Sequence, residues 1–271
     1  MNLGPIVLTT DFGNTDEYVG VLKGVILSIN PTVRIIDLNH AVPPQDISRA
    51  AHLVGRNRRY FPAGAIHLCI VDPGVGSNRR IIVVKDTAQF YIGPDNGVFS
   101  SILSQAESLD VYELTNESWF LEDPGTTFHG RDIMAPAAAR ISLGEPIKDA
   151  GPPVDPATCV IIPPCVPLCS DDRIIGEIIH IDHFGNLVSN IDRLEINRLS
   201  GAGNVVVQLR SARIPFKQCS YADLAENEVS AIINSSDLLE ICVKNGNGAA
   251  LTQARKGDRV ILSRGAVAEP Q

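Results

Sequence analysis

The sequence predicts an α/β protein with an N-terminal, mainly parallel sheet flanked by helices and a smaller C-terminal antiparallel β-barrel domain. Residues 1–150 alternate short apolar runs with helical patterns, which implies right-handed crossovers between parallel strands. Residues 151–170 are rich in proline and cysteine, a composition that cannot continue a helix or a central strand. Residues 171–271 consist of short strand patterns separated by turns, which is typical of a small barrel or sandwich. We therefore expect an α/β domain at 1–150, a linker at 151–170 and a barrel domain at 171–271.

Each N-terminal element follows from a local pattern. Short runs that are apolar and rich in β-branched residues predict buried strands, and apolar residues at helical intervals predict helices. Proline at position 136 should interrupt the last of these helices. The expected strands are 4–10, 33–38 and 65–71, with a hairpin from 80–86 and 89–93, and the expected helices lie at 14–30, 46–60, 97–106 and 130–144. The C-terminal strand patterns lie at 174–181, 186–191, 204–209, 230–235, 238–243 and 259–264.

Composition excludes several classes of protein. A net charge of −8 and a pI near 5.2 disfavour nucleic acid or an acidic membrane surface as a partner. No apolar run approaches the roughly 20 residues that span a bilayer, and the N-terminus lacks the basic region of a signal peptide. The six cysteines are too scattered for a disulfide scaffold. Cys159, Cys165 and Cys169 lack the C-x-x-C spacing of a zinc knuckle, so we expect reduced thiols in a cytoplasmic protein.

Three predicted strands deliver an acid at or near their carboxyl ends. These residues are Asp11 in TTDFG, Asp37 in IIDLNH and Asp72 in IVDPG. Ligands of open parallel sheets bind beyond this edge, where carboxylates would suit a metal, a cation or the two hydroxyls of a ribose. The alternative for each residue is an ordinary turn or helix-cap aspartate.

Two further stretches carry charged groups beside glycine. In DPGVGSNRR, Arg79 or Arg80 could fold back onto Asp72 and keep that acid ionised, although Arg80 is better interpreted as a solvated residue at the start of the next strand. In TTFHGRD, His129 precedes a helix, where it could be a general base, a metal ligand or a plain helix-start residue.

The C-terminal half has one unusual string, IIHIDHFGNLVSNI. Asp182, Phe184 and Asn186 there offer a carboxylate, an aromatic face and an amide at a strand-to-turn junction. Such a set can bind an amino-acid head group or flank a flat heterocycle. The competing interpretation is a hairpin turn with one core phenylalanine.

Seven motifs in order give the chain a resemblance to a known family. They are TTDFG, DLNHAVPPQDI, FPAGAIHLCIVDPGVGS, GPDNGV, TFHGRDIMAPAAA, HIDHFGNLVSNI and INSSDLLEI. Together they resemble the S-adenosylmethionine hydroxide adenosyltransferases, which hydrolyse S-adenosylmethionine and are related to fluorinases and chlorinases. The resemblance implies attack of water or hydroxide on C5′, giving adenosine and L-methionine. It also implies a homotrimer with the site between neighbouring subunits.

The resemblance also implies roles for individual residues. Asp72, Arg79 and His129 match the water-handling aspartate, arginine and histidine, and we expect Arg79 to orient Asp72 while His129 accepts or relays a proton. Asp11 matches the acid that grips the ribose, and Phe128 lies where a family aromatic contacts the nucleoside.

A second set matches the residues around the methionine part. It consists of Asp182, Asn186 and the intervening Phe184, together with Ser235 near the methionine carboxylate. The halogenating relatives have an arginine where this chain has Ser236, so the resemblance does not assign the group that neutralises that carboxylate.

Asp72 and His129 also separate a hydrolase from a halogenase. The halogenating relatives lack this histidine, and a halide pocket should avoid a carboxylate because a dehydrated anion beside another anion is strongly disfavoured. The alternatives are a halogenase, a non-catalytic protein that binds S-adenosylmethionine or adenosine, and a metal-dependent phosphohydrolase. The last is disfavoured because no Asp-x-Asp pair or His-rich cluster is present. We expect an enzyme without cofactor or metal.

Overall fold

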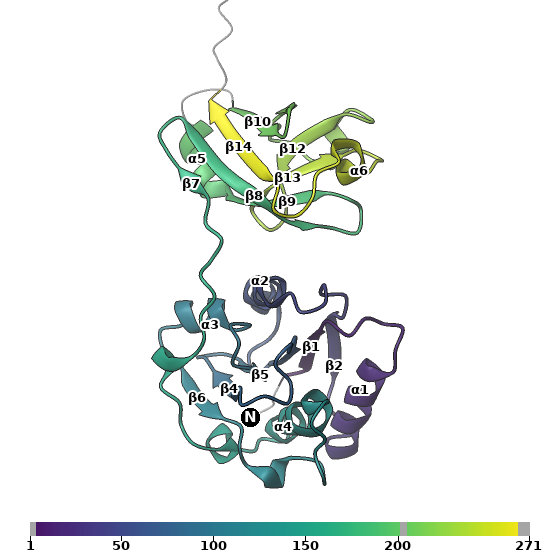
Figure 1. Ribbon diagram of the computed structural model, residues 1–271, viewed down its shortest axis with the longest axis vertical. Coiled ribbons are helices and arrows are strands. Elements are labelled where there is room, and N and C mark those ends of the chain that lie inside the picture. Colours follow the sequence, from purple (N-terminus) through teal and green to yellow (C-terminus); the bar gives the residue numbers. More distant parts are fainter. Residues whose placement is uncertain (1–3, 201–204, 265–271) are drawn as a thin grey trace, which may run out of the picture. The chain divides into compact units, whose positions relative to one another are not determined.

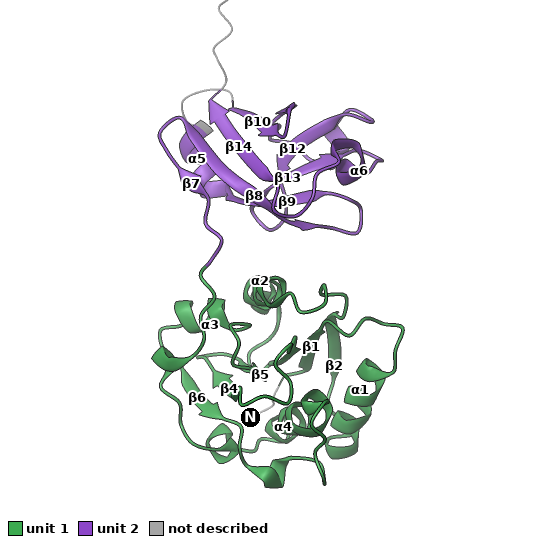
Figure 2. Cartoon of the chain, viewed as in Figure 1, with its two compact units in different colours: residues 1–163 green, residues 164–271 purple. Residues whose placement is uncertain are grey.

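The computed structural model describes residues 4–200 and 205–264 and divides the chain into two compact units (Figure 1, Figure 2). Unit 1 comprises residues 1–163 and unit 2 comprises residues 164–271. Each unit has its own apolar core. The predicted combination of an α/β part and an antiparallel barrel is confirmed.

The sheet of unit 1 is mainly parallel and has the strand order β2-β1-β3-β5-β4-β6. β1 pairs in parallel with β2 and β3, and β3 pairs in parallel with β5. β4 is antiparallel to both of its neighbours, so the predicted β4–β5 hairpin is confirmed. The strands are β1 Ile6–Thr10, β2 Ile35–Asn39, β3 Ile66–Ile70, β4 Ile81–Lys85, β5 Phe90–Pro94 and β6 Asp110–Glu113.

Helices cover both faces of this sheet (Figure 1). Because successive strand residues point to opposite faces, Leu68 packs into the core shared with α1 and α4, whereas Cys69 packs into the core shared with α2 and α3. The expected interruption near Pro136 takes the form of a π-helical turn, η3, that precedes α4. The helices are α1 Tyr18–Ile29, α2 Ile47–Asn57, α3 Ser100–Gln105 and α4 Ala135–Ser142, with η3 at Gly130–Met134.

Unit 2 is a nearly closed antiparallel barrel. Its strands follow the order β11-β10-β14-β8-β9-β13-β12, and β7 pairs with β8. The two ends of this path meet where Lys217 N donates to Ala231 O at 2.8 Å. The strands are β7 Leu168–Cys169, β8 Arg173–Ile181, β9 Leu187–Asp192, β10 Val205–Leu209, β11 Ala212–Pro215, β12 Val229–Ile233, β13 Leu238–Val243 and β14 Arg259–Arg264. The described part of the unit also contains two α-helices, α5 Arg193–Ser200 and α6 Gly248–Thr252, and a 3-10 turn, η6 Tyr221–Asp223.

The proline- and cysteine-rich segment contributes to both units. Val154 N donates to Val111 O at 2.8 Å and Val160 N donates to Asp95 Oδ1 at 2.9 Å, so this part of the segment is fixed on unit 1. Its last residues form β7 in unit 2. The linker boundaries at 151 and 170 stay a prediction. All six cysteines lie in the described ranges and are free thiols. Among the helices of the described residues, none has the length and apolar character that a bilayer crossing needs.

Candidate functional site

The loop after β3 folds Arg79 back onto Asp72. β3 is fully buried and ends at Ile70, and a turn in which Val75 N donates to Asp72 O at 3.2 Å reverses the chain. Arg79 Nε then donates to both carboxylate oxygens of Asp72, at 2.6 and 2.7 Å, and Arg79 Nη2 makes a third contact. The two side chains are only 10% and 5% exposed. The predicted pairing of an arginine with Asp72 is confirmed.

Arg80 behaves differently from our expectation of a solvated residue. Its guanidinium donates to Asp95 Oδ2 at 2.6 Å and to Thr158 O at 2.7 Å. Asp95 is almost fully buried, so Arg80 neutralises an internal carboxylate. The interpretation as a solvated arginine was wrong because the partner acid lies in a different loop, after β5.

His129 joins the pair from the start of η3. Its Nδ1 lies 3.1 Å from Arg79 Nη2. A guanidinium can only donate, so Nδ1 accepts, and a neutral imidazole then carries its proton on Nε2. Burial, followed by the positive charge of Arg79, lowers the pKa of His129, which keeps the ring neutral at neutral pH. Asp72, Arg79 and His129 therefore form one connected group, which we call the triad.

A glycine fixes how closely the triad's two loops approach. Gly76 has φ of +80°, and a Cβ at this position would lie 2.7 Å from Thr126 O. The loop that carries Asp72 and Arg79 therefore lies directly against the segment that leads to His129. On the far side, the buried carboxylate of Asp132 accepts from Gly125 N at 2.9 Å and secures the same segment.

Three aromatic rings, one of them next to His129 in sequence, pack on one another. The centroid of Phe128 lies 5.7 Å from Phe12 and 5.4 Å from Tyr18, both in edge-on arrangements. Phe12 follows Asp11, and Arg131 lies 5.2 Å over the Phe128 ring. Phe12 and Tyr18 were not predicted from the sequence, although both lie within eight residues of Asp11. Phe12 and Phe128 are partly buried and Tyr18 is exposed, so the group leaves aromatic surface open to solvent.

The strand-end acids do not form a single carboxylate cluster. Asp11 Oδ2 accepts from Gln45 N at 2.8 Å. Asp37 forms an ion pair with Lys23 at 2.6 Å and its Oδ1 lies 3.0 Å from His40 Nε2, so the structure assigns it a local role. The described residues contain no group of three or more His, Cys, Asp or Glu arranged to hold a metal ion.

In unit 2, Asp182 organises the turn between β8 and β9. Its Oδ1 accepts from Phe184 N at 2.9 Å and Asn186 N at 2.8 Å, and its Oδ2 accepts from Asn186 Nδ2 at 3.0 Å. Phe184 is 71% exposed and is therefore not the core residue of the alternative interpretation. The turn brings Asp182 and Asn186 together and presents an aromatic ring to solvent.

Ser235 lies on the neighbouring hairpin, between β12 and β13. The turn is exposed at Ser235, and Asp237 has a left-handed φ of 58°. Arg193 Nε donates to Asp237 Oδ1 at 2.7 Å and fixes one side of this turn. Asp182 and Ser235 thus lie on different hairpins of the same barrel.

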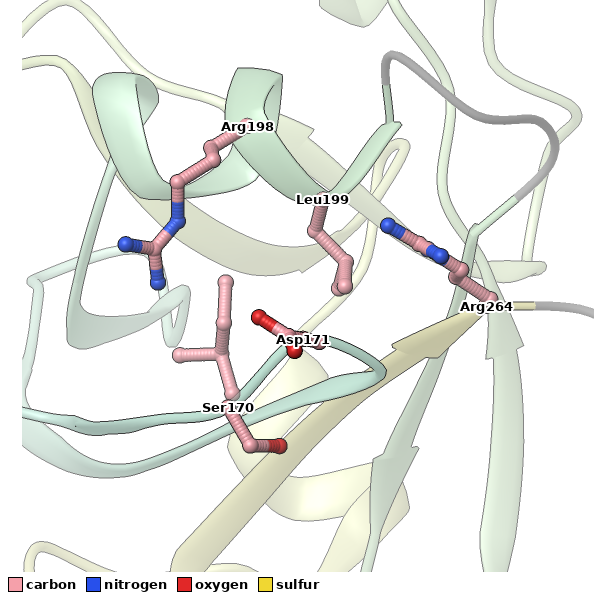
Figure 3. Close-up of a pocket in the computed structure, with 6 residues that line it drawn as sticks. Ser170, Asp171, Arg198, Leu199 and Arg264 are labelled. Carbon is pink, nitrogen blue, oxygen red and sulfur yellow. The ribbon is translucent and has the colours of Figure 1, made fainter.

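A small pocket of unit 2 lies at other residues (Figure 3). Its volume of about 100 Å³ is below the roughly 300 Å³ at which ligand pockets begin. It is lined by Ser170, Asp171, Ile174, Arg198, Leu199 and Arg264, none of which belongs to the predicted site.

The fold and the triad define a two-unit α/β and β-barrel protein with a buried acid–arginine pair and a partly buried histidine at the carboxyl edge of its parallel sheet. The chain belongs to the SAM hydroxide adenosyltransferase family: the family's N-terminal domain matches residues 6–151 and its C-terminal domain matches residues 176–261.

Individual relatives match almost the whole chain. An (R)-S-adenosyl-L-methionine hydrolase from Salinispora tropica is 38% identical, with 96% of this chain and 98% of the relative covered. A protein of the same name from Thermus thermophilus is 33% identical, with 95% and 99% covered. A fluorinase from an Actinoplanes species is 29% identical, with 73% and 75% covered. The crystal structure of an uncharacterized conserved protein from Thermotoga maritima superposes with a TM-score of 0.89 at 32% identity and covers 96% of this chain and all of that chain.

Proposed function

We propose that this chain hydrolyses S-adenosyl-L-methionine to adenosine and L-methionine. The observation that carries the proposal is the contact of Asp72, Arg79 and His129. Relatives with this activity in their names are 30–38% identical over at least nine-tenths of the chain, whereas the fluorinases are more distant.

The triad supports water as the nucleophile. A halide that loses its hydration shell in this site would add a second negative charge beside the carboxylate of Asp72, and the positive charge of Arg79 is already paired with that carboxylate. Water is neutral and can donate to the carboxylate. The buried ion pair therefore favours hydrolysis over halogenation.

The proposed reaction needs no acid to expel the leaving group. The C5′–O bond forms as the C5′–S bond breaks, and the electron pair of that bond goes to sulfur, which neutralises the sulfonium. The attacking water loses one proton. Since the Nδ1 atom of His129 accepts from Arg79, its Nε2–H is a donor that can orient the water, and Asp72 is the acceptor for the proton. This proposal differs from the expectation that His129 accepts or relays the proton.

We assign substrate contacts to the remaining residues by their chemistry and family position. Asp11 would accept hydrogen bonds from the ribose hydroxyls, and Phe128 would pack on the nucleoside. In unit 2, Asp182 and Asn186 would bind the methionine part, with Phe184 beside the nucleoside. Ser235 would lie near the methionine carboxylate.

We further propose that the protein is a cytoplasmic homotrimer whose site lies between neighbouring subunits, and that it acts without metal or cofactor. The division of the proposed contacts between unit 1 and unit 2 is consistent with a site built from more than one surface. The mass of the assembly in solution, measured by light scattering, tests the trimer.

A product analysis tests the reaction. Purified protein is incubated with S-adenosylmethionine, with and without chloride or fluoride and with and without a chelator, and the products are separated. Equal amounts of adenosine and methionine, independent of halide and chelator, are expected. A halogenated nucleoside would make the protein a halogenase, and binding without turnover would make it a binding protein. Near-normal turnover in Asp72→Asn, Arg79→Ala and His129→Ala would refute the assignment of the triad.

A further inference from the structure

Unit 2 contains a buried acid that the proposed reaction does not use. Glu240 lies on β13 and is 3% exposed. Its neighbours Leu239 and Ile241 point into the core of the barrel, so Glu240 points to the opposite face, where Ile232 and Cys242 form a smaller apolar cluster. A carboxyl group in such surroundings is costly unless its oxygens accept hydrogen bonds.

Both oxygens of Glu240 are occupied. The hydroxyl of Tyr221 donates to Oε1, and Asn234 Nδ2 donates to Oε2 at 3.0 Å. Burial raises the pKa of Glu240 above its ordinary value. The contact with Asn234 matters because Asn234 directly precedes Ser235, which we assign to the methionine part of the substrate.

Asn234 in turn shapes the hairpin apex. Its Oδ1 accepts from Ser236 N at 2.9 Å and Leu238 N at 3.1 Å, while its backbone O accepts from Asp237 N at 3.0 Å. An amide side chain can make these contacts only with its oxygen toward the turn and its nitrogen away from it. Glu240 reinforces the orientation that the two backbone donors require, because its Oε2 accepts from the amide nitrogen on the other side.

We propose that Glu240 is a positioning residue for the amino-acid end of the substrate: through Asn234, it holds the turn that presents Ser235 and Ser236. The proposal rests on the proposed function. Glu240 is buried, contacts the turn through Asn234 and is assigned no contact with the substrate. Its loss should weaken recognition of the methionine part and leave the bond-breaking step intact.

Kinetics of matched variants test this role. Glu240→Leu leaves Asn234 Nδ2 without an acceptor, so we expect KM for S-adenosylmethionine to rise about tenfold or more while kcat stays within about threefold. Glu240→Gln retains an acceptor oxygen for Asn234 and should stay close to the wild-type KM. Glu228→Leu is the control, since this acid lies at the other end of β12, where it pairs with Lys217 at 3.0 Å.

A double-mutant cycle separates positioning from general structure. Asn234→Ala changes a residue at the turn and keeps Glu240. It should reproduce the increase in KM even if Glu240→Leu folds poorly. The double variant should be no worse than the more severe single variant, because both changes break the same link. An unchanged KM in folded Glu240→Leu, or additive effects in the cycle, would overturn the inference. Lack of turnover in the wild-type protein would instead overturn the proposed function.

Discussion

The buried pair of Arg79 and Asp72 makes a sharp prediction about stability. Arg79→Met removes the guanidinium but keeps most of the apolar stem, and it leaves a carboxylate that is 5% exposed without its partner. Removal of one member of a buried ion pair costs about 3–5 kcal/mol, because the remaining charge is uncompensated. For a unit of residues 1–163, this corresponds to a fall in Tm of about 6–20 °C.

The assay is thermal and urea unfolding followed by circular dichroism, with turnover measured on the same samples. Lys23→Met is the matched control, because its partner Asp37 is 44% exposed and such surface pairs contribute about 0–1 kcal/mol. In Asp72→Asn/Arg79→Met both charges are absent, so more than half of the lost stability should return. Activity should stay low in this double variant. If Arg79→Met is no less stable than Lys23→Met, the pair is not desolvated as described and the reasoning fails.

Three further predictions concern the same unit. Burial and then Arg79 lower the pKa of His129, so the acid limb of the pH–rate profile should lie below pH 6.5, and His129→Asn should remove that limb in whatever activity remains. Burial lowers the pKa of His67 to about 4, so between about pH 6.5 and 4 the unfolded protein binds more protons than the folded protein. The free energy of unfolding therefore falls as the pH falls through that window. His67→Phe should flatten this dependence in unfolding titrations. Gly76→Ala should reduce turnover more than Gly144→Ala reduces it, because both glycines have positive φ but only the first meets a backbone oxygen; equal effects would contradict this contact.

The sequence predicts local features of the site better than distant ones. The pairing of Asp72 with Arg79 spans seven residues and a glycine turn, so complementary charge alone suggests it. The contact of Arg79 with His129 spans 50 residues and depends on the packing of η3 against the sheet. Periodicity carries no information about such a separation, and only the family resemblance brought these residues together.

The roles that the sequence did not predict all depend on the tertiary structure, which sets the exposure and the contacts of each side chain. Phe12 and Tyr18 are aromatic residues of the kind that usually pack in a core, and only their exposure in the structure distinguishes them from core residues. The local sequence predicts that Arg80 is solvated, because it does not reveal that Asp95, on another loop, will lie beside it. Glu240 sits in a strand whose apolar pattern predicts burial, but the pattern does not reveal that a carboxyl group is satisfied there by Tyr221 and Asn234.

In the hairpin between β12 and β13, the residues that fix the backbone are different from the side chains that the apex presents. The register of these strands is set by their paired residues from Val229 to Ile233, and the turn is held from behind by Glu240 and Asn234. The side chains of Ser235 and Ser236 take part in neither of these sets of contacts, although the backbone N of Ser236 donates to Asn234 Oδ1. Exchanges at these two positions can therefore change the charge presented at the apex without disturbing the barrel. This gives evolution, or a protein engineer, a place to change substrate preference at little cost to folding.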